Sequence, residues 1–296
     1  MVPQTPLLLS HLLLSSLGTQ VSLNYAERIP QEGSLIVVSN HRSFMDAPLL
    51  MTVLSQPIRF ACHHYMGQVP VLREIVTALG CVPLDSASQK QHFLRQASQL
   101  LQARQTVGIF PEGTQPMVQQ TAPNQVGAFQ RGFAHLALRT DKSAQLDRLE
   151  ADGLTRSPRQ NVAVLPRQNV AVSPRQNVAV SPTQDVAVSP MQNMAVSPPR
   201  NVAILPVAIA ALEESVCPAI PLPLLGLFDP SEPLFQQLGW HPLVLYHQVR
   251  VLVGRPYWVT PSQRQRYRGK QGKTVVNELT QYCQTEIAHL LDQGCA

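Results

Sequence analysis

A histidine and an aspartate five positions apart carry the clearest chemical signal in the sequence. His41 and Asp46 belong to residues 40–46, directly after the apolar run 34–39. In one ideal helix the two side chains would point roughly 140° apart and could not pair. They can meet if His41 lies in a loop and Asp46 in the first turn of a following helix. A carboxylate on one imidazole nitrogen fixes the tautomer and leaves the other nitrogen free to take a proton, as deprotonation of an alcohol requires.

The same residues also have a purely structural interpretation. Ser43 and Asp46 have the spacing of a capping box, in which Asp46 would only satisfy backbone donors at the start of a helix. A histidine beside a strand can equally serve the structure alone. This segment by itself leaves both interpretations open.

A second polar segment, residues 110–115, follows an apolar run at 106–110. It contains Glu112 between Pro111 and Gly113, and such turn residues let a backbone approach a ligand closely. Taken alone it could be an ordinary connecting turn. Because α/β folds place their sites at the carboxyl ends of their strands, we expect the two segments to converge.

Strands and helices alternate along most of the chain. This alternation predicts an α/β fold with a mostly parallel central sheet flanked by helices. Short apolar runs predict the strands, and apolar stripes predict the helices. The predicted strands are 34–39, 58–61, 81–84, 106–110, 204–210 and 246–253, and the predicted helices are 44–54, 70–79, 90–104, 129–139 and 273–291.

Six tandem octapeptides at 157–204 interrupt the alternation. Each offers too small an apolar element to offset the ordering entropy of a proline-punctuated loop, which favours disorder or loosely extended structure. A β-solenoid is the alternative, because NVAV alternates, and ordered repeats could form an interaction surface. A long surface insertion costs little loop-closure entropy, so we expect one domain with a low-complexity insertion that carries no chemistry. The predicted parts are an amino-terminal apolar helix (1–19), the first part of the domain (20–140), the insertion (141–200) and the second part with a carboxyl-terminal helix (201–296).

The motifs resemble those of the glycerolipid acyltransferase family, which includes 1-acylglycerol-3-phosphate acyltransferases. Residues 40–46 resemble its histidine-x4-aspartate block, and residues 110–114 resemble its proline-glutamate-glycine-threonine block. A basic-glycine element at 131–134, a proline-bearing strand at 205–208 and a glycine-basic-proline turn at 254–256 extend the resemblance. The first two blocks, in this order, are the specific part.

The resemblance implies acyl transfer from a thioester to a lipid hydroxyl without an acyl-enzyme intermediate. His41 would act as general base and Asp46 would orient it. The donor would be acyl-CoA or acyl carrier protein, and the acceptor 1-acylglycerol-3-phosphate in phospholipid synthesis. The implied substrate-binding residues are Asn40, Arg42, Ser43, Glu112, Gly113, Thr114, Arg131 and Pro206.

Two positions depart from the family pattern. Ser86 and Gln115 stand where the family usually has arginines, the first of which binds acceptor phosphate. Without them the site loses charge-assisted hydrogen bonds worth about 1.5–3 kcal/mol each. The acceptor could therefore be a lysophospholipid, a glycolipid or another hydroxyl compound. A catalytically silent lipid-binding homologue is a further alternative, against which the retained His41–Asp46 pair argues.

Charge, cysteines and the amino-terminal segment complete the expectations. Of the net charge of +5, the octapeptides carry +3 (four arginines, one aspartate), and the remaining +2 gives little support to nucleic-acid binding and suits a membrane surface. Five cysteines without metal spacing indicate reduced thiols, and neither a metal nor an organic cofactor is expected. Residues 6–14 are apolar but too short to span a bilayer, so they form either an interfacial helix or a buried one. We expect a peripheral or interfacially anchored protein at the cytoplasmic face of a membrane.

Overall fold

The structure is a computed structural model of the 296-residue chain. It describes residues 5–62, 74, 76–83, 90–113, 122–140, 202–227, 230 and 236–295. The chain divides into two units, Met1–Lys142 with Arg200–Ala296, and Ser143–Pro199. The second unit, with most of the octapeptides, lies outside the described residues, so the expectations for the repeat stay predictions.

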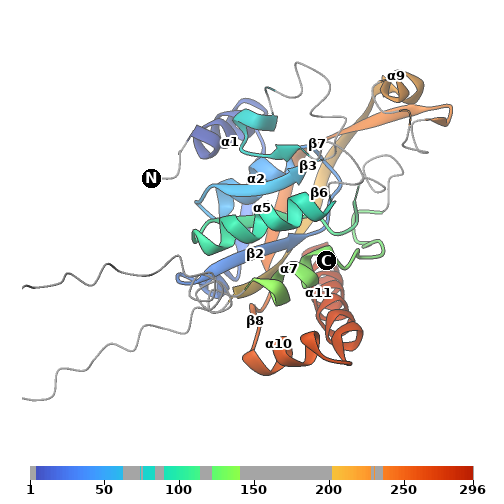
Figure 1. Ribbon diagram of the computed structural model, residues 1–296. Coiled ribbons are helices and arrows are strands. Elements are labelled where there is room, and N and C mark those ends of the chain that lie inside the picture. Colours follow the sequence, from blue (N-terminus) through green and yellow to red (C-terminus); the bar gives the residue numbers. More distant parts are fainter. Residues whose placement is uncertain are drawn as a thin grey trace, which may run out of the picture. The chain divides into compact units, whose positions relative to one another are not determined.

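A mostly parallel sheet forms the centre of the first unit, which confirms the predicted fold class (Figure 1). Its strands follow the order β1-β7-β6-β2-β5-β3-β4, with β8 beside β6. Only β7 and β8 run antiparallel to β6, and every other pairing among the described strands is parallel. The bounds are β1 Gln20–Asn24, β2 Ser34–Ser39, β3 Ile58–Cys62, β4 Val82–Pro83, β5 Thr106–Ile109, β6 Val202–Pro221, β7 Trp240–Val253 and β8 Tyr257–Trp258.

Two hydrophobic cores cover the two faces of the sheet. In β2, Ile36 and Val38 point into one core, whereas Leu35 and Val37 point into the other. Side chains of a strand alternate between its faces, so a strand buried on both faces is apolar at successive positions. The uninterrupted apolar run of β2 therefore reflects its place inside a helix-covered sheet.

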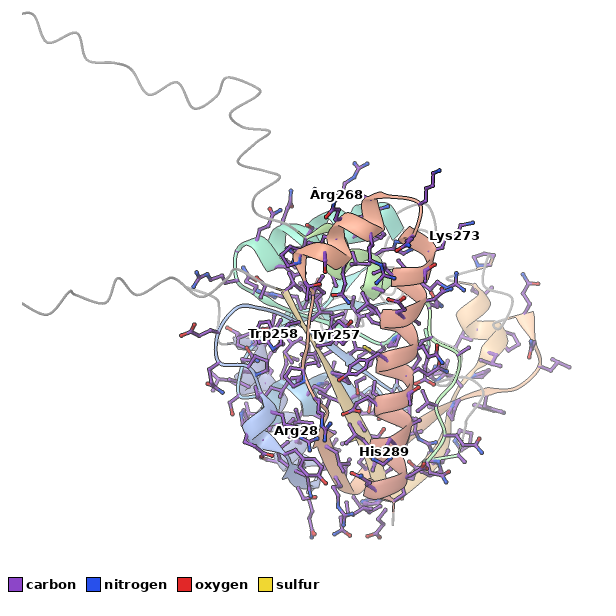
Figure 2. All side chains as sticks on the ribbon, turned by 90° about the horizontal axis from the view of Figure 1, so that it is seen from below. Arg28, Tyr257, Trp258, Arg268, Lys273 and His289 are labelled. Carbon is purple, nitrogen blue, oxygen red and sulfur yellow. The ribbon has the colours of Figure 1, made fainter. Side chains whose placement is uncertain are left out.

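Helices supply the outer layers (Figure 1). Residues of α1 and α2 contribute to the core that contains Val37, and those of α5, α7 and α11 contribute to the core that contains Ile36. Figure 2 shows α11, which packs on the face of the sheet that Ile36 points into, with Lys273 near its start and His289 near its end. The bounds are α1 Thr5–Ser16, η1 Ala26–Arg28, α2 Asp46–Val53, α5 Lys90–Gln102, α7 Gly132–Arg139, α9 Leu222–Gly226, α10 Pro261–Arg268 and α11 Gly272–Gly294.

The largest difference from the predicted elements lies in β6 and β7. Both extend well beyond the predicted runs 204–210 and 246–253, and they pair with each other as far as Pro221 and Trp240. Past Ala211 the side chains of β6 are largely exposed, and its apolar residues there are interrupted by Pro218 and Pro221. Backbone pairing between distant segments forms the extension, whereas apolar patterning alone had set the predicted ends. β1, β8 and α10 were not predicted at all.

Candidate active site

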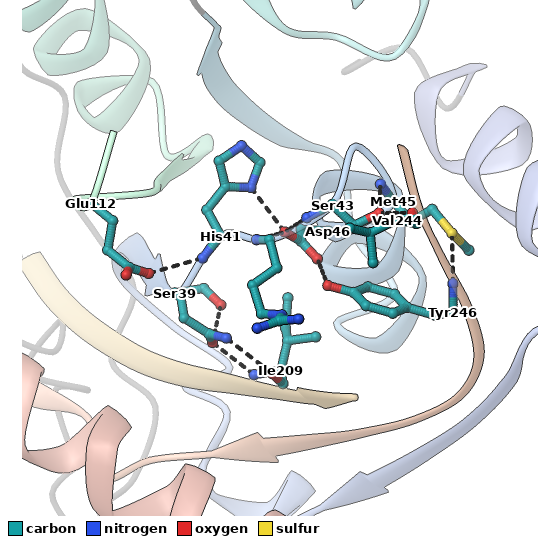
Figure 3. Close-up of polar contacts among 11 residues, drawn as sticks. Ser39, His41, Ser43, Met45, Asp46, Glu112, Ile209, Val244 and Tyr246 are labelled. Carbon is teal, nitrogen blue, oxygen red and sulfur yellow. Dashed lines mark hydrogen bonds and ion pairs between the residues drawn. The ribbon is translucent and has the colours of Figure 1, made fainter. Parts of the chain in front are cut away.

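The two polar segments do converge, as expected from the parallel sheet. β2 and β5 are parallel neighbours, and the loop after β2 lies beside the turn after β5 (Figure 3). The contact between them is a hydrogen bond of 3.1 Å from the backbone N–H of His41 to Oε1 of Glu112. The carboxyl ends of the two central strands therefore form one site.

His41 and Asp46 form a hydrogen-bonded pair. His41 lies in the loop and Asp46 is the first residue of α2, and Nδ1 of the imidazole is 2.9 Å from Oδ2 of the carboxylate. An ionised carboxylate only accepts, so Nδ1 carries the proton and Nε2 keeps its lone pair. Asp46 is fully buried, whereas the His41 side chain keeps 17% of its surface exposed. The geometry leaves Nε2 as a base open to a ligand.

Asp46 also satisfies the backbone of the loop, as the capping interpretation required. Its Oδ2 accepts hydrogen bonds from the backbone N–H groups of Arg42 (2.7 Å) and Ser43 (2.8 Å). Only half of the capping box forms, because Oγ of Ser43 accepts from the N–H of Met45 and not from that of Asp46. Orienting the imidazole and capping the loop are therefore two functions of one carboxylate.

Glu112 braces the loop from the side of β5. Its Oε1 accepts from the N–H of His41 and its Oε2 from the N–H of Gly127, at 2.6 Å. Burial raises the pKa of this carboxyl, while the two backbone N–H groups act in the opposite direction. The residues around Glu112 form the expected turn, in which the N–H of Gly113 donates to the carbonyl of Phe110.

The ring of Phe110 stacks on the imidazole of His41 and restrains it. The two rings stack with centroids 4.0 Å apart and planes 10° apart. Phe110 stacks in turn on Phe60 of β3, at 4.9 Å. Since a stacked ring is restrained in χ2, this contact complements the restraint that Asp46 applies through Nδ1.

Besides Glu112, three of the implied substrate-binding residues make contacts within the protein. The amide of Asn40 exchanges two hydrogen bonds with the backbone of Ile209 in β6 (3.0 and 2.9 Å). Arg42 is buried and pairs with Glu214 at 2.6 Å, and Oγ of Ser43 donates to the carbonyl of Val244 at 2.7 Å. These contacts fasten the loop to β6 and β7, and a role of the three residues in substrate binding stays a prediction.

The other implied binding residues lie around the same edge of the sheet or outside the described residues. Gly113 has a φ of 74°, in the left-handed region that glycine tolerates. Arg131 is exposed at the start of α7, and Pro206 is buried opposite Val38 of β2. Thr114, Ser86 and Gln115 lie outside the described residues.

Sequence reasoning missed three residues that complete the site. The hydroxyl of Tyr246 in β7 donates to Oδ1 of Asp46 at 2.8 Å, from 200 positions away in the chain. Gly127 donates to Glu112, and Glu214 reaches Arg42 where β-bulges interrupt the pairing of β6. The two acids at 213 and 214, at the end of an apolar run, could have indicated a polar contact at this end of the strand. Nothing local in the sequence relates Tyr246 to Asp46 or Gly127 to Glu112.

One further histidine stands within electrostatic reach of the site. Burial lowers the pKa of His241 in β7, and the neighbouring charge of His41 lowers it further, against a hydrogen bond to the carbonyl of Pro242. His241 is therefore neutral at physiological pH and contributes no fixed positive charge beside His41.

Sequence comparison relates the part of the chain that contains both loops to a known family. Residues 20–152 match the family model described as "Acyltransferase". The chain is therefore similar to acyltransferases over these residues. The segments 40–46 and 110–114 both fall inside the matched stretch.

Curated relatives of this part of the chain include two proteins named 1-acyl-sn-glycerol-3-phosphate acyltransferase. The protein from Borreliella burgdorferi is 23% identical over 128 residues, which cover 43% of this chain and 49% of that protein. The chloroplastic enzyme of Arabidopsis thaliana is 25% identical over 124 residues, covering 41% of this chain and 33% of that protein. The chain thus matches no more than half of the length of these relatives.

A solved structure also resembles the chain. It is the 1-acyl-sn-glycerophosphate acyltransferase PlsC of Thermotoga maritima, with a TM-score of 0.49 and 16% sequence identity. The similarity covers 97% of this chain and 77% of that one.

Proposed function

We propose that this protein transfers a fatty acyl group from a thioester to the hydroxyl of a lipid. The observation that carries the proposal is the His41–Asp46 pair, with Nδ1 bound to a buried carboxylate and Nε2 open at a partly exposed ring. A base with a fixed tautomer beside an open edge of the sheet suits deprotonation of an alcohol. The acyltransferase family of residues 20–152 supports the same reaction.

The proposed reaction is a direct transfer. Nε2 of His41 takes the proton from the acceptor hydroxyl as its oxygen attacks the thioester carbonyl. The tetrahedral intermediate collapses as the carbon–sulfur bond breaks, and the protonated imidazole returns the proton to the departing thiolate. Asp46 stabilises the imidazolium between these two steps, and Phe110 and Glu112 keep the ring and its backbone in place.

We favour 1-acylglycerol-3-phosphate as the acceptor, because the curated relatives carry that substrate in their names. The alternative is an acceptor without a phosphomonoester, such as a lysophospholipid or a glycolipid. Ser86 and Gln115, in place of two arginines usual in this family, motivate this alternative. The donor is acyl-CoA or acyl carrier protein, and an acyl-transfer assay with both donors distinguishes them.

We also propose that α1 holds the protein at a membrane surface. One face of the helix packs inward through Pro6, Ser10 and Leu14, while Leu8 and Leu12 are 62% and 66% exposed. Positions four apart share a face of a helix, so the two leucines form an apolar stripe away from the core. Among the described helices, none has both the length and the apolar character to cross a bilayer. An interfacial helix beside lipid substrates suits the proposed reaction.

Removal of the imidazole tests the function. We expect His41→Ala to lower acyl transfer by about 10²- to 10⁴-fold, the usual contribution of a general base. Purified protein, reconstituted with vesicles, is supplied with labelled acyl-CoA or acyl carrier protein. The acceptors are lysophosphatidate, glycerol-3-phosphate, lysophospholipids and neutral hydroxyl lipids.

His289→Ala is the matched control, because His289 is exposed on α11 and bonds only Gln293 among the described residues. The control should keep full activity, and both variants should melt as the parent does. Transfer that persists in His41→Ala contradicts the assignment of the base. No histidine-dependent transfer to any acceptor favours a silent lipid-binding protein.

A further inference from the structure

The carboxylate of Asp46 is held by donors from two distant parts of the chain. Oδ2 accepts from the loop itself, through His41 and two backbone N–H groups. Oδ1 accepts from the phenol of Tyr246, which is 1% exposed (Figure 3). Among the described residues, three of these four donors meet Oδ2 and one meets Oδ1.

Tyr246 is the single donor to Oδ1 among the described residues. If this bond is lost, Oδ1 becomes a buried acceptor without a partner, and the carboxylate gains freedom to turn about χ2. Such a turn changes the direction and length of the bond that Oδ2 makes to Nδ1 of His41. Phenol and imidazole therefore act on one another through the carboxylate between them.

The phenol also keeps its proton over the working range of pH. Burial raises the pKa of Tyr246 well above its ordinary value, and the charge of Asp46 raises it further. Tyr246 is thus a permanent donor, whose positive hydrogen points at the carboxylate. This hydrogen reduces the negative potential that the imidazolium of His41 experiences.

β7 fixes Tyr246 to the same loop by additional contacts. Its backbone N–H lies 3.3 Å from the sulfur of Met45, and the carbonyl of Val244 accepts from Ser43. The loop that carries the base is therefore fastened to the strand that carries the phenol. A change in the position of β7 reaches Asp46 directly.

From these contacts we infer that Tyr246 is a positioning residue for the proposed acyl transfer, which sets both the direction and the proton affinity of the His41–Asp46 pair. The inference rests on the proposed function, because it assigns Tyr246 to the same site. Tyr246 does not touch substrate in this scheme and acts only through Asp46.

Tyr246→Phe tests this role, because it removes the hydroxyl and keeps the ring. We expect kcat to fall by roughly 10- to 100-fold, the usual effect of a lost hydrogen bond to a charged group. Loss of the donor strengthens the attraction between Asp46 and the imidazolium, which favours the protonated ring. The acid limb of the kcat/KM profile should therefore move to higher pH.

Two further variants separate positioning from packing. In an Asp46→Asn background, Tyr246→Phe should add little to the loss, because the phenol acts through the carboxylate. A site-specific fluorotyrosine at position 246, which is a stronger donor, should move the acid limb to lower pH. Tyr282→Phe is the matched control, since among the described residues its hydroxyl donates only to the carbonyl of Arg255. It should change neither kcat nor the profile.

The other charged or titratable groups near the pair stay the same in these variants. Among the described residues they are Glu112 and His241 around His41, and Arg42 and Glu214 around Tyr246. Additive losses in the double variant, or an acid limb that does not move, would overturn the inference. NMR spectra of the His41 ring recorded across the same pH range in the parent and in Tyr246→Phe test the same effect without turnover. An unchanged His41 titration therefore refutes the role of Tyr246 independently, whereas absence of acyl transfer with a shifted titration refutes only the proposed function.

Discussion

At the scale of residues, one carboxylate carries two functions that the sequence presented as alternatives. Asp46 orients His41 and also accepts the backbone N–H groups of Arg42 and Ser43. The two functions use the same oxygen, so removing the side chain would lose both. A substitution that keeps the hydrogen bonds and removes the charge can separate them.

Asp46→Asn makes this separation. The amide oxygen can still accept from the loop, and the amide N–H₂ can face the phenol oxygen of Tyr246, which also accepts. The cap should persist while the negative charge that stabilises the imidazolium is lost. We expect kcat to fall by roughly 10²- to 10⁴-fold, with little change in Tm.

The two measurements are acyl transfer per folded molecule and thermal unfolding. A lower Tm with unchanged activity per folded molecule would mean that Asp46 serves only as a cap. Full loss of activity with an unchanged Tm assigns its main contribution to catalysis.

At the scale of elements, the segment before α7 contacts the site although it lies outside the motifs at 40–46 and 110–114. The N–H of Gly127 bonds Glu112, and its carbonyl accepts from Gln284 of α11 at 3.0 Å. A Cβ at position 127 would lie 2.9 Å from Oε2 of Glu112, closer than such contacts occur. Glycine at this position lets the N–H of residue 127 come close to the carboxylate of Glu112. The carboxylate held in this way also accepts from the N–H of His41.

Gly127→Ala should therefore alter the position of the His41 imidazole through Glu112, without a direct contact between residues 127 and 41. Glu112 must move away, which releases the N–H groups of both His41 and residue 127. We expect a fall in kcat of about tenfold and a loss of stability of about 1–3 kcal/mol, the cost of buried groups left without partners.

Gly132→Ala is the control for the glycine change. A Cβ at position 132 meets nothing within 4 Å, and alanine is favoured over glycine in a helix such as α7. Kinetics and denaturant unfolding of both variants give the comparison. Equal activity of the two variants would contradict the bracing role of Glu112.

At the scale of the whole molecule, the proposed membrane attachment rests on α1. The sequence left an interfacial helix and a buried helix open, and the described geometry has features of both. The helix packs on α2, where Oγ of Ser10 faces the sulfur of Met51 at 3.9 Å. Its outer stripe of Leu8 and Leu12 remains exposed.

A double variant, Leu8→Ser and Leu12→Ser, should lower binding to phosphatidylcholine vesicles by at least about tenfold, given the transfer free energy of exposed leucines. Neutral vesicles keep the charge of the protein out of the result. His11→Ser, at an exposed position of the same helix, should bind as the parent does. Co-sedimentation gives the measurement, and equal binding of all three proteins would exclude α1 as the attachment.

The sequence by itself determined the elements whose patterns are local. The apolar run of β2, the stripe of α11 and the spacing of His41 and Asp46 all depend on neighbours in the chain, so the central elements and the His41–Asp46 pairing were predictable. The two motifs that resemble those of acyltransferases are likewise short and local.

Tertiary structure alone decided the partners that come from far along the chain. Tyr246 meets Asp46, Gly127 meets Glu112, and β6 extends along β7 because strands and loops distant in sequence pack side by side. Backbone pairing and buried hydrogen bonds leave no period in the sequence, since each depends on the position of a partner and not on the type of the adjacent residue. The His41–Asp46 pair was therefore visible in the sequence, and the groups that hold it were visible only in the fold.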